Sequence, residues 1–243
     1  MTTEFNLIGD VAGEYDTLQA LVAKMPNCKT ILVGDMVDRG PKSAQVLNLV
    51  MDNLDKFGAV LGNHDHMMLS ALAKTRYYPS DVWSWNGGGA TVRSYHNLGI
   101  SIFSDEEGTP DNDMKKKVIA FLQSLPLYIQ QDGLFVSHAF PNPSMPLPVS
   151  CDLERWGKNY SQVEMSIIWN RGEPRRMKDF YQVTGHNSHW GLRKFSDKQG
   201  EYGICLDTSR SKILTGMHWP SMQIFQQEYI VPTDLPFPDG DDE

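Results

Sequence analysis

The stretch KTILVGDMVDRG, residues 29–40, joins a predicted strand to a charged turn and decides the fold. Its first six residues are mostly aliphatic or β-branched, which is typical of a buried strand. Asp35, Asp38 and Arg39 follow the glycine that ends this run, and apolar residues at helical spacing resume at Ser43–Asn53. The stretch therefore predicts a strand, a tight turn and a helix, with charged side chains at the carboxyl end of the strand.

The segments on both sides repeat this order of strand, polar turn and helix. Phe5–Gly9 and Phe57–Gly62 are short apolar runs, and Tyr15–Lys24 and Met67–Ala73 follow them with apolar residues at helical spacing. Alternation of this kind, with nearly continuous apolar strands, is typical of right-handed βαβ units and a buried parallel sheet. The first third of the chain is therefore predicted to form the parallel part of an α/β domain.

The rest of the chain predicts a second sheet. Strand-like runs follow one another at short spacing, which favours a mixed or antiparallel arrangement. We expect strands at Gly133–Ser137, Phe180–Thr184, Tyr202–Leu206, Ile213–Met217 and Met222–Ile230, a helix at Asp113–Leu125, and a loop at the glycine-rich WSWNGGG, residues 83–89. Because no repeat or linker interrupts this pattern, residues 1–230 are predicted to form one domain, followed by an acidic, proline-rich tail at 231–243.

The composition is that of an ordinary globular protein. Of the 243 residues, 40% are hydrophobic and 21% are charged, which allows one sizeable core. The net charge of −8 disfavours general nucleic-acid binding, because such binding needs a basic surface. Three scattered cysteines, an N-terminus unlike a signal peptide and the lack of a long apolar run predict a cytoplasmic protein without disulfides or membrane spans.

Polar clusters end five of the predicted strands. The first three strands lead to Asp10, to Asp35 with Asp38 and Arg39, and to Asn63 with His64, while FVSHAF supplies His138 and VTGHNSHW supplies His186 and His189. In open α/β sheets the carboxyl ends of neighbouring strands line one crevice, so these side chains are expected to converge. Each alone is more often a turn, a cap or a core histidine. Five together predict a metal site of mixed oxygen and nitrogen ligands.

Five motifs occur in the order of a known family. GD at residues 9–10, GDMVDRG at 34–40, GNHD at 62–65, SH at 137–138 and GH at 185–186 resemble the calcineurin-like metallophosphoesterases, and NGGG at 86–89, IWNR at 168–171 and LDT at 206–208 resemble further landmarks. The resemblance spans about residues 5–230 and is closest to the phosphoprotein-phosphatase branch that includes bacteriophage lambda phosphatase. It implies an α/β fold of four layers, an αββα sandwich with two mixed β-sheets.

The resemblance also implies roles for individual residues. Asp10 and Asp35 match ligands of a first metal, and Asp35, Asn63, His138 and His186 match those of a second. His64 matches the proton donor to the leaving oxygen, Asp38 the carboxylate that orients it, and Arg39 and Arg171 the side chains that hold the phosphate. Two divalent cations are expected, with Mn²⁺ favoured over Fe or Zn²⁺. Such a pair lowers the pKa of a shared water towards hydroxide, which attacks phosphorus.

One position departs from the family pattern. The family has GDxHG where this chain has GDVAG, so Ala12 replaces an imidazole ligand of the first metal. Either water or a side chain such as His189 or His66 fills the gap, or only the second metal binds tightly, or the chain has lost activity, as a natural pseudo-enzyme or through an engineered His-to-Ala change. His189 follows His186 by three residues rather than the family's usual two, and packing beside Trp190 explains it equally well. Because the acid, its orienting carboxylate and both phosphate-holding arginines are retained, a working or weakened hydrolase is favoured.

The expected activity is metal-dependent hydrolysis of phosphate monoesters, on phospho-Ser/Thr proteins or small phosphoesters, with a first metal site weakened by Ala12. One alternative is a dinucleoside-polyphosphate or other nucleotide hydrolase; such enzymes share the GDxHG, GD and GNHD pattern but typically depart from VDRG. Another is an impaired pseudo-enzyme that holds phosphate with Arg39 and Arg171. The expected partner is the substrate, in the cytoplasm of a bacterial or phage-infected cell. The physiological substrate, the metal and the oligomeric state stay open.

Overall fold

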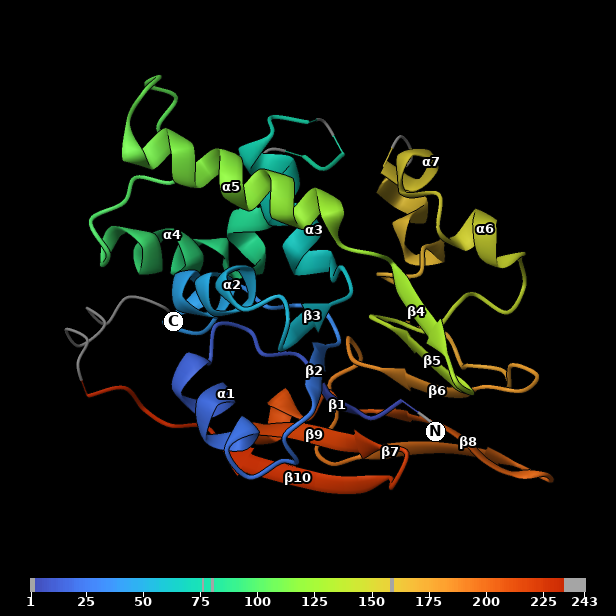
Figure 1. The fold of residues 1–243 in the computed structure, drawn as a ribbon. Helices are drawn as coiled ribbons and strands as arrows, with labels where there is room; N and C mark the ends of the chain where they lie inside the picture. The colour runs from blue at the N-terminus through green and yellow to red at the C-terminus, as the bar shows by residue number, and fades with distance from the viewer. Residues whose placement is uncertain (1–2, 76, 80, 158–159, 234–243) are drawn as a thin grey trace.

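Two mixed β-sheets form the centre of the molecule in the computed structural model, which describes residues 3–75, 77–79, 81–157 and 160–233 (Figure 1). In this described part, the first sheet has the order β10-β9-β1-β2-β3 and the second β4-β5-β6-β8-β7. The strands of the first sheet are β1 Phe5–Ile8, β2 Lys29–Leu32, β3 Phe57–Ala59, β9 Ile213–Trp219 and β10 Gln223–Glu228. Those of the second are β4 Tyr128–Gln131, β5 Leu134–Ser137, β6 Tyr181–Thr184, β7 Arg193–Asp197 and β8 Gly200–Cys205.

Each sheet contains three strands that run parallel to one another. β1 pairs in parallel with β2 and β2 with β3, while β9 and β10 add antiparallel strands on the other side of β1. In the second sheet β5, β6 and β8 run parallel, with antiparallel β4 and β7 at the edges. The carboxyl ends of the parallel strands in each sheet therefore lie along one edge, where the polar residues that follow them can meet.

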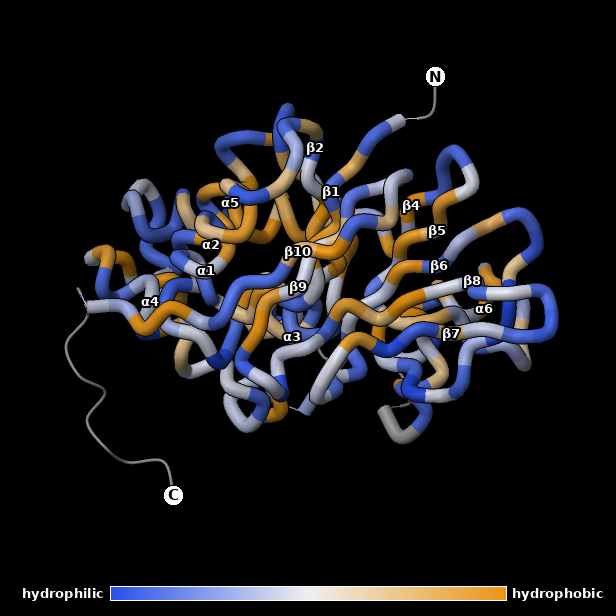
Figure 2. Tube along the Cα trace, turned by 90° about the horizontal axis from the view of Figure 1, so that it is seen from below, coloured by the Kyte–Doolittle hydropathy of each residue, from blue (hydrophilic) through white to orange (hydrophobic). Residues whose placement is uncertain are grey.

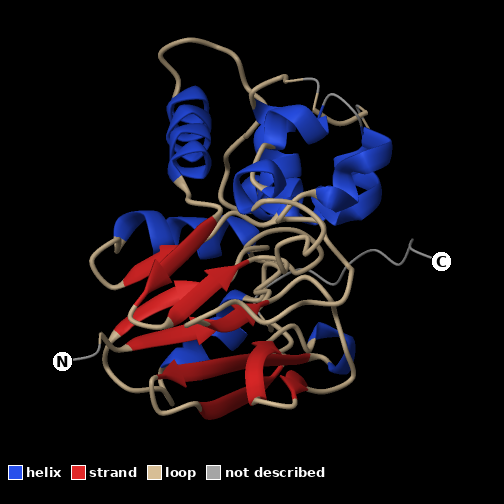
Figure 3. Ribbon diagram, turned by 90° about the vertical axis from the view of Figure 1, so that its right-hand side faces the viewer, coloured by secondary structure: helices blue, strands red, loops and turns tan. Residues whose placement is uncertain are grey.

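Helices cover the outer face of the first sheet (Figures 1 and 3). Ile8 and Leu32 of the sheet share an apolar core with Leu47, Met68 and Leu122 of these helices. The helices are α1 Tyr15–Val22, α2 Ser43–Asp52, α3 Asn63–Leu72, α4 Gly89–His96 and α5 Pro110–Ser124. The shorter α6 Leu147–Ser150 and α7 Leu153–Gly157 lie towards the second sheet, and η1 Ser84–Gly88, η2 Tyr160–Met165 and η3 Ser209–Ser211 are short helical turns.

Strand alternation separates two apolar layers. Leu7 of β1 packs with Val136 and Ile204 of the second sheet and so fills the space between the sheets, whereas the next residue, Ile8, packs against the helices. Successive side chains of a strand point to opposite faces, which explains this division. Figure 2 shows the resulting hydrophobic segments running through the middle of the sheets. The predicted fold, two mixed sheets flanked by helices, is confirmed.

The prediction of a loop at residues 83–89 is wrong. Ser84–Gly88 forms the helical turn η1, which leads directly into α4, and Gly87, with a φ of 101°, is a kink inside η1. A side chain on Gly88 would lie 2.6 Å from the Trp83 ring. This glycine is therefore explained by close packing against the indole rather than by a loop.

Other predicted elements have mixed outcomes. The helices and strands predicted from apolar spacing are present, but the edge strands β4 and β7 are absent from the prediction. Of the predicted tail, residues 234–243 lie outside the described residues, and the single domain at 1–230 stays a prediction. In the part of the chain that the structure describes, none of the helices combines the length and the apolar composition needed to cross a bilayer.

Candidate functional site

The polar clusters that end the strands meet at one cavity of about 330 Å³. Asp10 follows β1, Asp35 follows β2, Asn63 begins α3, and His186 follows β6; all four line the cavity. The chain turns sharply at these positions, since the backbone φ is 48° at Asp35 and 67° at His186. Space is tight as well, because a side chain on Gly185 would lie 2.0 Å from Asp10 Oδ1. The fold thus brings together clusters that are far apart in the sequence.

A candidate cation site consists of four side chains from these polar clusters: Asp35, Asn63, His138 and His186. Asp35, His138 and His186 are buried, and each presents a ligand atom within 4.8 Å of the others. Asn63 Oδ1 lies 2.9 Å from His138 Nε2 and 2.9 Å from His186 Nδ1. The carboxylate, amide and imidazole groups form a mixed oxygen and nitrogen set that suits Mn²⁺, Fe or Zn²⁺. They are the residues that the sequence predicts for the second metal.

Backbone carbonyls determine which ring nitrogen each histidine offers to this site. His138 Nδ1 lies 2.8 Å from the carbonyl oxygen of Val33, and His186 Nε2 lies 3.1 Å from that of Trp169. Because a carbonyl only accepts hydrogen bonds, these two nitrogens carry the protons. In the neutral rings that bind a metal, His138 Nε2 and His186 Nδ1 would then present their lone pairs on the side of Asn63. Metal-binding histidines are usually supported in this way, so the donor set fits a divalent cation.

The electrostatics of the site favour a buried positive charge. Burial raises the pKa of Asp35, but the charges of His138 and His64 outweigh burial and hold this pKa well below its usual range. Burial lowers the pKa of His138, yet Asp35 raises it to about 10. Burial, followed by the charge of His138, lowers the pKa of His186 to about 3. The surroundings of Asp35 therefore stabilise a positive charge next to this carboxylate.

The predicted first metal site contains carboxylates but lacks the family's imidazole. Asp10 accepts hydrogen bonds from the backbone N–H of His186 at 3.0 and 3.2 Å, and with Ala12 and Asp35 it borders a small cavity beside the main one. Burial and the neighbouring Asp207 raise the pKa of Asp10. Asp207 is 3% exposed and lines the main cavity, although the sequence assigned it no role. Its position just after β8 is the signal that could have identified it.

Neither histidine suggested as a replacement for the missing ligand belongs to the cation cluster found among the described residues. His189 lines the cavity, but its Nε2 lies 3.4 Å from Arg193 Nη1. His66 is buried, its Nδ1 lies 2.7 Å from the Tyr78 hydroxyl, and its ring packs against Tyr77 and Tyr78. His66 is therefore a packed core residue, whereas His189 lines the cavity but lies outside the cation cluster.

His64 lies in the first turn of α3, between a carboxylate and an arginine. Its Nδ1 is 2.7 Å from Asp38 Oδ2, and its Nε2 is 3.1 Å from Arg39 Nη2. Trp83 Nε1 donates to both oxygens of Asp38 at 3.0 Å, and Thr91 Oγ1 donates to Oδ1 at 2.7 Å. Asp38 is fully buried, so these donors replace the water that it lost on folding. The histidine and the carboxylate predicted to orient it are thus in direct contact.

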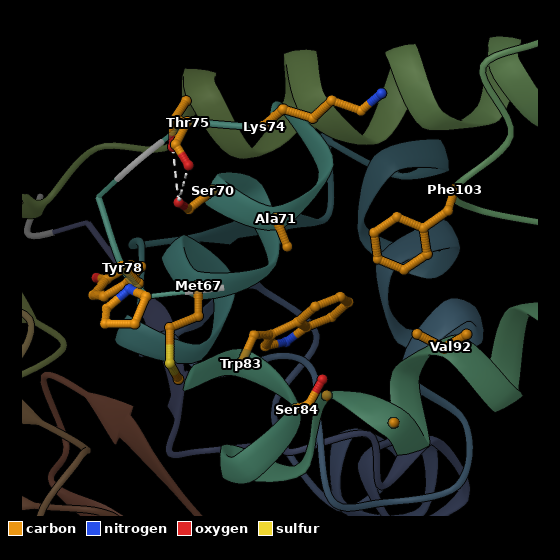
Figure 4. Close-up of a pocket in the computed structure, with 13 residues that line it drawn as sticks. Met67, Ser70, Ala71, Lys74, Thr75, Tyr78, Trp83, Ser84, Val92 and Phe103 are labelled. Carbon is orange, nitrogen blue, oxygen red and sulfur yellow. Dashed lines mark hydrogen bonds between the residues drawn. The ribbon is translucent and has the colours of Figure 1, made fainter. Parts of the chain in front are cut away.

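Trp83 also lines a second, largely apolar cavity of about 330 Å³ (Figure 4). Met67, Val92 and Phe103 line the same cavity, and the ring centroids of Phe103 and Trp83 are 5.9 Å apart. The indole thus borders this cavity with its ring and holds the Asp38 carboxylate through its Nε1.

Replacing Trp83 with phenylalanine keeps an apolar wall and removes the donor to Asp38. We expect the free energy of unfolding to fall by about 1.5 to 3 kcal/mol, the usual contribution of a hydrogen bond to a charged group. We also expect kcat to fall with KM unchanged, because Asp38 acts on His64 rather than on the substrate. Urea denaturation and steady-state kinetics measure the two effects. Phe103→Leu alters the same cavity without touching Asp38 and serves as the control; equal kcat values for the two variants would contradict the positioning role.

Four arginines also line the main cavity: Arg39, Arg171, Arg193 and Arg210. The first two are exposed to solvent and are the residues predicted to hold phosphate. Arg193 lies in β7 and Arg210 in η3, and neither was predicted to have a role. The cavity therefore combines carboxylate and imidazole donors with guanidinium groups, an arrangement suited to a cation and a phosphate together.

Comparison with known proteins shows which sequences and folds the chain resembles. The family model described as calcineurin-like phosphoesterase matches residues 4–214. The symmetrical bis(5'-nucleosyl)-tetraphosphatase of Klebsiella pneumoniae (strain 342) is 46% identical over 80 residues, which are 31% of this chain and 28% of the relative. That of Vibrio campbellii is 29% identical over 180 residues, which are 72% of this chain and 56% of the relative. The chain thus spans only 28 to 56% of the length of these two relatives.

Solved structures agree on the fold. One assigned as a diadenosine tetraphosphatase has a TM-score of 0.58 at 20% identity and covers 93% of both chains. A protein serine/threonine phosphatase from Saccharomyces cerevisiae has a TM-score of 0.58 at 14% identity, covering 96% of this chain and 82% of that chain. At such low sequence identities, the similarity to these structures shows a shared fold and nothing more. Because the family model matches most of the length of the chain, the protein belongs to the calcineurin-like phosphoesterase family.

Proposed function

We propose that this protein is a metal-dependent phosphohydrolase that cleaves dinucleoside polyphosphates. The observation that carries the proposal is the cavity, where Asp35, Asn63 and His186 face the same space as His64 and four arginines. One phosphoryl group needs fewer cationic side chains than this, whereas a polyphosphate chain can use several. The relatives named symmetrical bis(5'-nucleosyl)-tetraphosphatases support this substrate class. The nucleotide alternative thereby takes precedence over the phosphate-monoester activity expected from the sequence.

Two groups of side chains would hold the cations. Asp35, Asn63, His138 and His186 would hold one divalent cation, and Asp10 together with Asp35 would hold another, with fewer ligands from the chain. Bound divalent cations supply Lewis-acid charge at the phosphoryl group and make water acidic enough to serve as the nucleophile. The smaller ligand set predicts that the first cation binds more weakly than the second.

The remaining side chains bind the phosphate and move a proton. Arg39 and Arg171 hold non-bridging oxygens through their planar guanidinium groups. The 3.1 Å contact between Arg39 Nη2 and His64 Nε2 opens when Arg39 turns to the phosphate, which frees this nitrogen to take up a proton from water. As the bond between phosphorus and the leaving oxygen breaks, protonated His64 donates its Nε2 proton to that oxygen, and Asp38 holds the imidazole in place.

A substrate comparison tests the proposal. With Mn²⁺ present, we expect kcat/KM for diadenosine tetraphosphate to exceed that for a phosphoserine peptide by at least about tenfold, a difference of 1.4 kcal/mol in transition-state binding. We expect ADP as the only nucleotide product, because the relatives are named for symmetrical cleavage. Chromatography of the products and a phosphate-release assay measure these quantities. A higher kcat/KM for the peptide, or no turnover of the dinucleotide, would overturn the assignment.

Hydrolysis of phosphate monoesters is the second candidate, and Asp38 favours it. The alkoxide leaving group of a phosphoserine is a strong base, so its departure depends on a positioned acid. The contact of 2.7 Å between His64 Nδ1 and Asp38 Oδ2 supports such an acid. A phosphate leaving group is a weaker base and depends on the acid less. A chain that binds phosphate but turns over neither substrate class would instead be the impaired pseudo-enzyme.

A further inference from the structure

Two of the four cavity arginines exceed what the reacting phosphoryl group needs. Arg39 and Arg171 serve that group in the proposed function, which leaves Arg193 and Arg210 as further cationic side chains of the same cavity. The chain as a whole is acidic, with a net charge of −8, so this local positive charge runs against the composition. The cavity of about 330 Å³ lies within the range of pockets that bind whole small molecules rather than single ionic groups.

Arg210 is available for an anion. Within the described residues, Arg193 pairs with Glu173 at 2.5 Å, but no carboxylate forms an ion pair with Arg210. The Arg210 guanidinium instead lies over the ring of Trp190, 5.7 Å from its centroid. Trp190 is 74% exposed although the guanidinium occupies one side of it, so the other face of the indole is open to a flat ligand. An unpaired guanidinium and an open indole therefore lie next to each other.

Hydrogen bonds fix the backbone that carries Trp190 and Arg210. Ser188 Oγ and Ser209 Oγ are 2.8 Å apart, and the backbone N–H of Arg210 donates to Ser188 Oγ at 2.9 Å. The Ser211 hydroxyl donates to the carbonyl oxygen of Trp190 at 2.5 Å. These contacts join the turn after β6 to the turn after β8, two neighbouring strands of the second sheet. The backbone that carries Trp190 and Arg210 is thus fixed before a ligand arrives, which lowers the entropy lost on binding.

We infer that Trp190, Arg193 and Arg210 form a nucleotide subsite at the edge of the cavity. Arg210 and Arg193 bind phosphates beyond the one that reacts, and the open face of Trp190 stacks on the nucleobase. The ligand class is a nucleoside diphosphate unit, either as part of the substrate or as the released product. A base stacks on an indole whatever its identity, so the subsite selects nucleotides over inorganic polyphosphates with little preference among bases. This inference rests on the proposed function and specifies how that function selects its substrate.

Binding to the His64→Asn protein in the presence of Mn²⁺ tests the subsite without turnover. Isothermal titration calorimetry compares ADP with pyrophosphate, which has the same number of phosphates and no base. We expect ADP to bind about tenfold more tightly, the size expected for one base stacked on an aromatic ring. Adding Trp190→Ala should bring the two dissociation constants within about twofold, and adding Arg210→Ala should weaken both by a similar factor.

The chain offers a matched control. Arg155 lies over the ring of Trp156, 5.2 Å from its centroid, in the same kind of contact but away from the cavity. Arg155→Ala should leave both dissociation constants unchanged. Equal binding of ADP and pyrophosphate, or loss of ADP binding in Arg155→Ala, would overturn the subsite, as would a phosphopeptide that depends on Arg210 more strongly than ADP does.

Failure of the subsite and failure of the proposed function give different results. If diadenosine tetraphosphate is hydrolysed with a KM that Arg210→Ala does not change, the subsite is wrong and the function stands. If ADP binding depends on Trp190 and Arg210 but no dinucleotide is cleaved, the subsite stands and the proposed function is wrong.

Discussion

Replacing His64 with asparagine should lower kcat for diadenosine tetraphosphate by about 10²-fold and for phenyl phosphate by up to about 10⁴-fold, the range over which a positioned acid contributes to catalysis. The two substrates differ because phenoxide is a stronger base than a leaving phosphate and gains more from the Nε2 proton. Asparagine can still donate to Asp38 Oδ2, as His64 Nδ1 does at 2.7 Å, so the buried carboxylate keeps a partner. Steady-state kinetics on both substrates, with Mn²⁺ present, measure the effect.

The pattern across leaving groups separates loss of the acid from general damage. A damaged fold lowers all rates by a similar factor, whereas loss of a proton donor makes the rate depend more steeply on the acidity of the leaving alcohol. The leaving group of 4-nitrophenyl phosphate is more acidic than phenol. His64→Asn should therefore lower kcat for 4-nitrophenyl phosphate by a smaller factor than kcat for phenyl phosphate. His96 is exposed near the end of α4 and lines neither cavity, so His96→Asn is the control and should retain full activity. Equal losses on all three substrates would contradict the assignment of His64 as the acid.

The sequence predicted the convergence of the site because strand ends are easy to recognise. An apolar run that stops at a glycine and a polar residue marks the carboxyl end of a strand, and parallel strands bring these ends together. Helix α3 was placed too late in the chain, at Met67, because its first turn consists of polar site residues rather than an apolar stripe. The structure begins it at Asn63, where the Asp65 carboxylate accepts the backbone N–H groups of Gly62 and Met36 at 3.0 Å.

The part of the site that the sequence could not predict lies on short or charged elements. Arg193 belongs to the edge strand β7, RKFSD, whose charges hide the apolar alternation, and Arg210 belongs to a three-residue turn. Neither arginine lies in a segment with a hydrophobic periodicity that could place it near Asp35. The substrate class was ranked by the VDRG motif, which contains the orienting carboxylate Asp38 and the phosphate ligand Arg39 but says nothing about Arg193 and Arg210. In the proposed function these two arginines bind the additional phosphates, and only the fold brings them to the cavity.

Replacing Ala12 with histidine should tighten the first cation site by about 10- to 100-fold, since even outer-shell partners of a metal site contribute that much to affinity. Ala12 borders a small cavity together with Asp10 and Asp35, so an imidazole at this position would face both carboxylates. Its backbone φ is 46°, a conformation in which histidine is one of the more frequent residues, so the substitution adds little strain. Calorimetric titration with Mn²⁺ and metal analysis after gel filtration should show that the Ala12→His protein binds the ion at the first site more tightly than the unmodified protein does. Its kcat should also be higher.

Free imidazole provides an independent test of the same gap. If the first site lacks only a nitrogen ligand, added imidazole should raise the rate of the unmodified protein until it saturates, and the Ala12→His protein should not respond. Ala12→Leu fills the space without offering a ligand and should gain neither metal affinity nor rate. Two equally tight ions in the unmodified protein would instead mean that the chain already supplies a replacement ligand. Asp207, buried against the cavity wall, and His189 are the side chains to replace next in that case, because both line the cavity that Asp10 and Asp35 share.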